Sequence, residues 1–220
     1  MNKRIISFVY RILLTISLST GIILNVMRTT SISAILSYYT LQSNIICLVV
    51  FVAILVISAV SDKYQESDVY YLVKGGITIA IAITGLVYAI ALGPIGFEMN
   101  INTNGFENFM SNFLVHRLSP ILVILDYFFF DKKGKFKFYY PFIWLIIPLN
   151  YLIYVYAYSS NGGEFFGIGG SRRFAYIFLD YTKIGYQGVT KAIVIMGFTI
   201  LLISFILVIA DRILGRSKGR

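Results

Sequence analysis

The chain has few of the residues that build metal sites and disulfide frameworks. Its 220 residues include one cysteine, Cys47, and one histidine, His116. A single cysteine excludes a disulfide framework and a thiolate metal site, and a single histidine excludes a histidine cluster. We therefore expect no bound metal and no cofactor.

Charged residues are scarce as well. They make up 13% of the chain, against 58% hydrophobic residues and a mean hydropathy of +0.79, whereas a soluble domain carries roughly 25% charged residues. The net charge is +9, but the basic residues lie in short loops and at the termini, which is typical of orientation signals and lipid-headgroup contacts. The composition predicts a multi-pass protein of the cell membrane that binds no nucleic acid.

Six apolar windows are long enough to span a bilayer, which takes roughly 20 mostly apolar residues. The first window follows Lys3 and Arg4 in the manner of a signal peptide, but it is too long for one and is interpreted as a retained span. We predict an all-α polytopic bundle of six transmembrane helices, forming one domain over residues 1–220. The windows are Ile5–Met27, Tyr38–Val60, Tyr71–Leu92, Phe113–Phe130, Tyr139–Tyr158 and Val189–Ile209.

The distribution of lysine and arginine predicts that both termini are cytoplasmic. Two connections are long, Gly93–Asn112 and Ser159–Gly188, and this orientation places both outside. Four basic loop residues then lie outside: Arg28, Arg172, Arg173 and Lys183. Eleven lie inside, as the positive-inside rule requires: Lys3, Arg4, Lys63, Lys132, Lys133, Lys135, Lys137, Arg212, Arg216, Lys218 and Arg220.

Ionisable side chains inside the spans are costly in lipid and are therefore candidates for function. They are Arg11, Lys74, His116, Arg117, Asp126 and Lys191. Lys74 and Lys191 lie near span ends, where a lysine can reach the interface and act as an anchor. Arg11 and Asp126 lie deeper and are interpreted as structurally paired, with each other or with water. Alternatively, Arg11, Asp126 and Lys74 line a transport path.

Asn112 and Pro120 share a helix face with His116. Asn112 and Pro120 lie one turn before and after it, and residues at i and i+4 share a face. Pro120 has no N–H, so in an α-helix the carbonyl of His116 loses its donor. We expect span four to be loosened and bent near His116.

Span two opens with Tyr38-Tyr39-Thr40-Leu41-Gln42-Ser43-Asn44, in which Thr40 and Asn44 share a face. Spans two and four begin on the same side of the membrane, so Thr40 and His116 lie at matched depth. An imidazole within hydrogen-bond reach can take the hydroxyl proton and activate Thr40 as a nucleophile. The alternative is that these polar side chains only join neighbouring helices.

These motifs resemble those of the androgen-induced gene family of membrane proteins, which includes the androgen-dependent tissue-factor-pathway-inhibitor-regulating proteins, and especially its bacterial branch. The resemblance lies in the span-two string, in His116-Arg117-Leu118-Ser119-Pro120 with Leu125-Asp126-Tyr127, and in Phe174-Ala175-Tyr176-Ile177-Phe178-Leu179-Asp180 with Gly185. It implies a six-span threonine hydrolase that cleaves fatty acid esters of hydroxy fatty acids. Thr40 would be the nucleophile and His116 the base. The span-two motif departs from the animal form.

Several residues are candidates for supporting such a reaction. Ser43, Asn44 or Arg117 would donate hydrogen bonds to the oxyanion, and Asn112 would accompany His116. Asp180, just before span six on the same side, would orient the imidazole. The partners would be membrane lipids or fatty acid esters. The competing hypotheses are a non-catalytic lipid-binding or scaffold protein and a small transporter.

Overall fold

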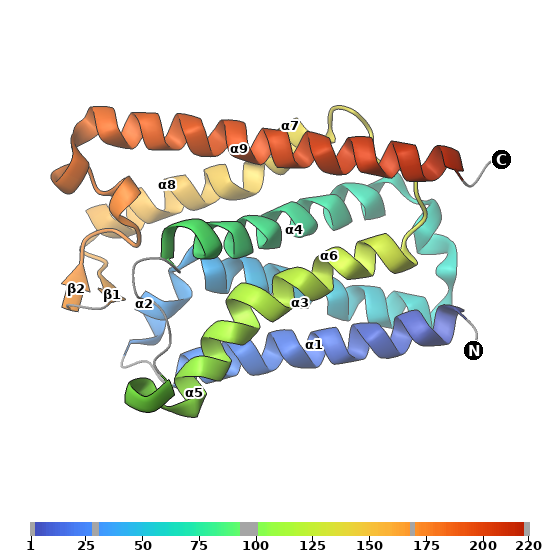
Figure 1. Ribbon diagram of the computed structural model, residues 1–220, viewed down its shortest axis with the longest axis horizontal. Coiled ribbons are helices and arrows are strands. Elements are labelled where there is room, and N and C mark those ends of the chain that lie inside the picture. The colour runs from blue at the N-terminus through green and yellow to red at the C-terminus, as the bar shows by residue number, and fades with distance from the viewer. Residues whose placement is uncertain (1–2, 28–30, 93–100, 168–169, 218–220) are drawn as a thin grey trace.

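The protein is a bundle of long helices that run along one axis (Figure 1). The computed structural model describes residues 3–27, 31–92, 101–167 and 170–217. Within these residues, six helical stretches are long and apolar enough to cross a membrane: Lys3–Met27, Tyr39–Val60, Asp68–Ile90, Phe109–Phe130, Tyr140–Ser160 and Tyr181–Arg216. The predicted six-span, all-α bundle is confirmed, and the chain is a multi-pass membrane protein.

Two of the spans contain a π-helical turn. The first half of the chain forms α1 (Lys3–Met27), α2 (Ile32–Leu36), α3 (Tyr39–Val60), the 3₁₀ turn η1 (Asp62–Glu66), α4 (Asp68–Val87), the π-turn η2 (Tyr88–Leu92), α5 (Ile101–Phe113), the π-turn η3 (Leu114–Leu118) and α6 (Ser119–Phe130). The second half forms α7 (Tyr140–Trp144), α8 (Ile146–Ser160), β1 (Phe165–Gly167), β2 (Gly170–Arg172), the 3₁₀ turn η4 (Ile177–Leu179) and α9 (Tyr181–Ser217). Span three therefore ends in η2, and span four passes through η3.

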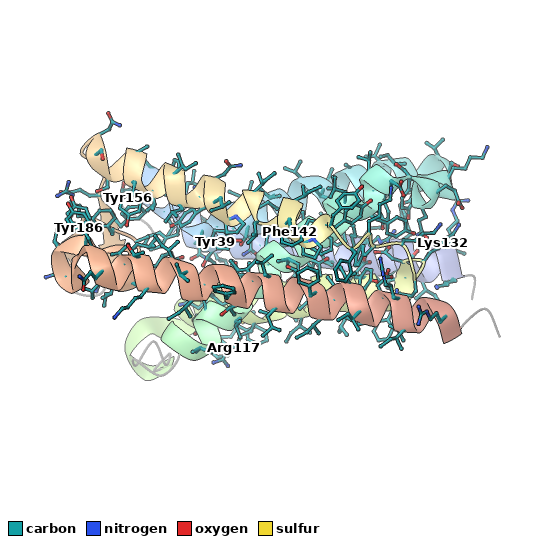
Figure 2. All side chains as sticks on the ribbon, turned by 90° about the horizontal axis from the view of Figure 1, so that it is seen from above. Tyr39, Arg117, Lys132, Phe142, Tyr156 and Tyr186 are labelled. Carbon is teal, nitrogen blue, oxygen red and sulfur yellow. The ribbon has the colours of Figure 1, made fainter. Side chains whose placement is uncertain are left out.

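The start of α1 and the end of α9 lie at the same end of the bundle, and α2, α5 and the β1–β2 hairpin lie at the other (Figure 1). Figure 2 shows Lys132 at the first of these ends and Tyr186 at the second. The excess of basic residues predicts that the end with the termini is the cytoplasmic end. Of the residues in that count, Arg28, Lys218 and Arg220 lie outside the described ranges.

Both long connections that were predicted as loops contain regular structure. In Gly93–Asn112, residues 93–100 lie outside the described ranges, and α5 begins at Ile101. In Ser159–Gly188, strands β1 and β2 pair antiparallel, and α9 begins before the predicted Val189. Gly185 interrupts α9 with a φ of 69°, a left-handed conformation that favours glycine. The chain therefore turns at Gly185 into the last span.

Four buried charged side chains tie α1, α4 and α6 together beside Lys132. Arg11 Nε donates to Asp126 Oδ1 at 2.9 Å, Arg11 Nη2 lies 3.1 Å from Asp131 Oδ1, and Lys74 binds Asp126. None of the four is more than 2% exposed. We call Arg11, Lys74, Asp126 and Asp131 the ion cluster. The predicted Arg11–Asp126 pair is present, but Lys74 does not reach the interface, because Asp126 provides a buried counter-ion.

Candidate active site

The structure brings Thr40 and His116 within hydrogen-bond distance. Thr40 lies in the first turn of α3, just after the N-cap residue Tyr38, and His116 lies in η3. Thr40 Oγ1 is 3.2 Å from His116 Nε2. Thr40 is buried and His116 is partly buried. The two side chains thus meet, as their matched depth in the membrane allows.

A π-helical register positions His116. The N–H of Ser119 bonds to the carbonyl of Leu114, five residues earlier. In this register the next donor would be Pro120, which has no N–H, and the carbonyl that loses a donor is Val115. The expectation that His116 loses its carbonyl partner assumed an α-helical register. In the η3 turn, the carbonyl without a donor is therefore that of Val115, one residue before His116.

A side chain from α3 replaces that donor. Asn44 Nδ2 donates to the Val115 carbonyl at 3.1 Å and to the Thr40 carbonyl at 2.7 Å. One amide group therefore bonds to the backbone of both helices that carry the candidate pair. Asn44 fixes α3 against η3 at the level of Thr40 and His116.

The imidazole of His116 is held on two further sides. Nδ1 lies 3.2 Å from the carbonyl oxygen of Asn112, and the ring stacks on Tyr88 at a centroid distance of 4.3 Å and an interplanar angle of 24°. A carbonyl can only accept a hydrogen bond, so this contact assigns the proton of the neutral ring to Nδ1. The lone pair of Nε2 then faces the hydroxyl of Thr40.

Two glycines let the helices approach at this level. A Cβ added to Gly85 in α4 would lie 3.2 Å from Pro120 Cβ and 3.4 Å from the His116 carbonyl oxygen. A Cβ added to Gly21 in α1 would lie 2.9 Å from Val115 Cγ1. Small residues are how membrane helices come close together, and here they bring α1 and α4 against η3.

An apolar pocket of about 110 Å³ opens beside Thr40, between α4, α8 and α9. Most of its lining is aliphatic, and its polar groups are hydroxyls. The lining residues are Tyr39, Thr40, Ile83, Thr84, Val87, Leu145, Pro148, Leu149, Tyr151, Leu152, Tyr176, Phe178, Leu179, Ala192, Ile193, Met196, Gly197 and Ile200. Thr40 therefore touches the pocket on one side and His116 on the other.

The structure places the other predicted site residues in different positions. Asn112 contacts His116 as described. Ser43 Oγ donates to the Thr40 carbonyl at 3.0 Å and shares a hydrogen bond of 2.7 Å with Thr84, so it supports the start of α3. The guanidinium of Arg117 lies 5.6 Å from the centre of the Tyr88 ring, and Figure 2 shows Arg117 at the edge of the bundle.

Asp180 lies in the segment that leads into α9. It accepts hydrogen bonds from the N–H of Thr182 at 2.9 Å and from Thr182 Oγ1 at 2.5 Å. An aspartate that binds the first amides of a helix is a typical N-terminal cap. Nδ1 of His116 donates its described hydrogen bond to the Asn112 carbonyl, so a backbone carbonyl holds the position that was assigned to Asp180.

Three residues of the site were not found from the sequence: Thr84, Tyr88 and Tyr176. Thr84 and Tyr88 are one turn apart on span three, which ends at the depth where spans two and four begin. The same depth comparison extended to span three would have found them. Tyr176 lies in the run Phe174–Asp180 that was noted only for its family resemblance.

The described residues include no group of three or more histidine, cysteine, aspartate or glutamate side chains that could hold a metal. Comparison of the chain with models of protein families, with curated proteins and with solved structures finds no match. Family membership thus stays a prediction from the motifs, and the function is argued from the geometry of Thr40, His116 and the pocket.

Proposed function

We propose that this protein is an intramembrane lipid ester hydrolase in which Thr40 is the nucleophile and His116 the general base. One observation carries the proposal: Thr40 Oγ1 lies 3.2 Å from His116 Nε2. A base must lie within hydrogen-bond reach of the proton that it takes, and contacts in a resting enzyme are often slightly long. The pair has the arrangement of an activated hydroxyl nucleophile.

The tautomer of His116 suits the base role. With its proton on Nδ1, held by the Asn112 carbonyl, the ring can accept the Thr40 proton on Nε2. Thr40 Oγ1 then bonds to the ester carbon while the carbonyl electrons move to its oxygen. When the carbonyl reforms, the bond to the leaving alcohol breaks, and His116 returns the proton to that oxygen. Water releases the acyl group by the same steps, which regenerates Thr40.

The pocket supports a lipid substrate. None of the described residues that line it is charged, and it lies among helices that face lipid, so an acyl chain can occupy it without burying a polar group. From Ala192 to Ile200 its wall on α9 extends for about 12 Å along the helix. This shape and the resemblance to a family of fatty acid ester hydrolases favour long-chain esters.

A lipid-binding protein without catalysis would use the same pocket, and it is the main competing function. Transport has less support, because the charges of Arg11, Lys74 and Asp126 pair with one another. Hydrolysis requires the Thr40–His116 pair to react, whereas lipid binding requires only the pocket. A chemical test of the pair therefore separates the two functions.

The test uses the purified protein in phosphatidylcholine nanodiscs, with a fluorophosphonate label and p-nitrophenyl octanoate as substrate. Thr40→Ala and His116→Ala should each abolish labelling and turnover, and the double variant should be little worse than either, because the pair acts as a unit. Thr40→Ser should keep partial activity, since a hydroxyl remains.

Thr190→Ala is the matched control, because Thr190 is an exposed threonine of α9 that bonds only within its helix. It should keep full activity. Turnover that persists in Thr40→Ala and His116→Ala would remove the hydrolase proposal. Retained binding of a fluorescent fatty acid with no turnover in the unaltered protein would favour the lipid-binding function.

A further inference from the structure

Three tyrosines surround Thr40 at the polar end of the pocket. Tyr39 comes from α3, Tyr151 from α8 and Tyr176 from the segment before η4, and all three line the pocket together with Thr40. Tyr39 and Tyr151 rings lie edge to face at 5.1 Å. The wall beside Thr40 is thus rich in hydroxyl donors, whereas most of the rest of the pocket is aliphatic.

Two of these hydroxyls, those of Tyr39 and Tyr151, make no hydrogen bond within the described residues. Tyr39 is 8% exposed, and within the described residues its Oη makes no hydrogen bond. A buried polar group without a partner costs about 1–3 kcal/mol, so such a group commonly has a role. A ligand with a hydrogen-bond acceptor at the end of an apolar chain would satisfy it. An ester carbonyl is such an acceptor.

Tyr176 lines the same pocket as Thr40, and its ring lies 6.4 Å from the ring of Tyr151. Burial raises the pKa of the Tyr176 hydroxyl to about 12, against the opposing effect of the side chain and backbone of Thr40. The phenol therefore keeps its proton at neutral pH and can donate it in a hydrogen bond.

The start of α3 adds to this environment. Thr40 is in the first turn, where the N–H groups have no helical acceptor and the helix dipole is positive. The negative charge that develops on the ester oxygen, two bonds from Thr40 Oγ1, would therefore meet a phenol O–H in an electropositive setting.

We propose that Tyr176 donates the hydrogen bond that stabilises the oxyanion formed when Thr40 attacks an ester. The inference rests on the proposed function and assigns to Tyr176 the role first considered for Ser43, Asn44 and Arg117. As Thr40 Oγ1 bonds to the carbon, its proton goes to His116 Nε2 and the carbonyl oxygen becomes negative. Tyr176 keeps its proton throughout and releases the oxygen when the carbonyl reforms and the alcohol leaves.

The decisive variant is Tyr176→Phe, assayed in phosphatidylcholine nanodiscs with p-nitrophenyl octanoate. Loss of one oxyanion donor lowers kcat about 10²–10³-fold, and KM should change little, because the hydrogen bond forms chiefly in the transition state. Tyr158→Phe is the matched control. Tyr158 is outside the pocket, with its hydroxyl 3.4 Å from a loop carbonyl, so it should keep full kcat.

A second measurement separates chemistry from packing. A fluorinated tyrosine at position 176 keeps the shape of the side chain and makes its hydroxyl a stronger donor. It should alter kcat while leaving the thermal unfolding temperature unchanged. A purely structural Tyr176 would leave kcat unchanged with this residue, and that result overturns the inference even if Tyr176→Phe fails to fold.

The two proposals fail in different ways. If Thr40→Ala abolishes turnover and Tyr176→Phe keeps its kcat, Tyr176 is not the oxyanion donor and the hydrolase proposal stands. If Thr40→Ala retains turnover, the proposed function fails and the role of Tyr176 fails with it.

Discussion

The ion cluster and the Thr40–His116 site are two polar groups in one apolar bundle, and span four contributes to both. Asp126 and His116 lie ten residues apart on it, about 15 Å along a helix. In the ion cluster, each charge faces an opposite charge, and all four side chains are buried. In the site, the groups are a hydroxyl, an imidazole and phenols, and the hydroxyl and the phenols border a pocket.

This difference indicates that the ion cluster stabilises the fold, whereas the Thr40–His116 site is available for chemistry. A buried ion pair is costly to break, because the remaining charge has no solvent. Neutral hydrogen-bonding groups contribute less, about 0.5–1.5 kcal/mol each, and the loss of one is tolerated by the fold. The cluster is therefore suited to fix α1, α4 and α6, and the site is suited to exchange partners with a ligand.

The largest expected effect is on stability, from Asp126→Ala. This change leaves Asp131 as the one counter-ion that the ion cluster still offers to Arg11 and Lys74, and breaking a buried pair in this way costs about 3–5 kcal/mol. Thermal unfolding in detergent, followed by size-exclusion fluorescence, measures it. His116→Ala should unfold at nearly the temperature of the unaltered protein, because it removes neutral contacts.

A charge-matched variant sharpens this comparison. Lys74→Met combined with Asp126→Asn removes one charge of each sign, so it should be more stable than Asp126→Asn alone. If the double variant is the less stable one, the charges do not compensate each other as the structure indicates. Variants that fold should keep fluorophosphonate labelling, because the cluster lies far from Thr40.

A smaller effect is expected on substrate choice, from Gly197→Phe in α9. Gly197 lines the pocket, and a Cβ added there meets nothing within 4 Å, so the new ring has room to enter the space of an acyl chain. Removing contacts worth about 1.5 kcal/mol lowers turnover of p-nitrophenyl octanoate about tenfold. Turnover of the acetate ester should not change.

The ratio of the two rates is the measurement, and Gly197→Ala, which adds one methyl group, is the control. Equal losses on both esters would mean that the ring has disturbed Thr40 and His116. Unchanged rates on both would mean that the acyl chain binds outside this pocket.

The spans and the Thr40–His116 pair could be predicted because both depend on local signals. Apolar runs mark helices of bilayer length, and the position of a residue in its span gives its depth. Depth alone does not give the face of a helix. Lys74 was therefore expected at the interface, whereas its partner Asp126, on another span, holds it inside the bundle.

Two other features depend on information that a sequence pattern does not contain. The sequence shows that Pro120 lacks a backbone donor, but the carbonyl that loses this donor depends on the helical register. In the π-turn η3 that carbonyl belongs to Val115, whereas in an α-helix it would belong to His116. Tyr176 lies in an irregular segment without helical periodicity. Its place beside Thr40 follows from the tertiary fold of the chain between α8 and α9.

The smallest expected effect tests how Asn44 and Pro120 cooperate in building the site. In η3 the Val115 carbonyl has no backbone donor because Pro120 lacks an N–H, and Asn44 Nδ2 donates to it at 3.1 Å. Asn44→Ala leaves this buried carbonyl without that donor, at a cost of about 1–3 kcal/mol. Pro120→Ala restores a backbone N–H. In the Pro120→Ala background, the cost of Asn44→Ala should therefore be lower by about 1 kcal/mol, a coupling of the size found between residues that share a partner. Unfolding of the four variants measures it.

The hydrogen bond from Asn44 to the Thr40 carbonyl is lost in both backgrounds, so it cancels from the difference. Equal costs in the two backgrounds would mean that Asn44 does not replace the donor that Pro120 lacks, and another cause for the register of η3 would then be needed.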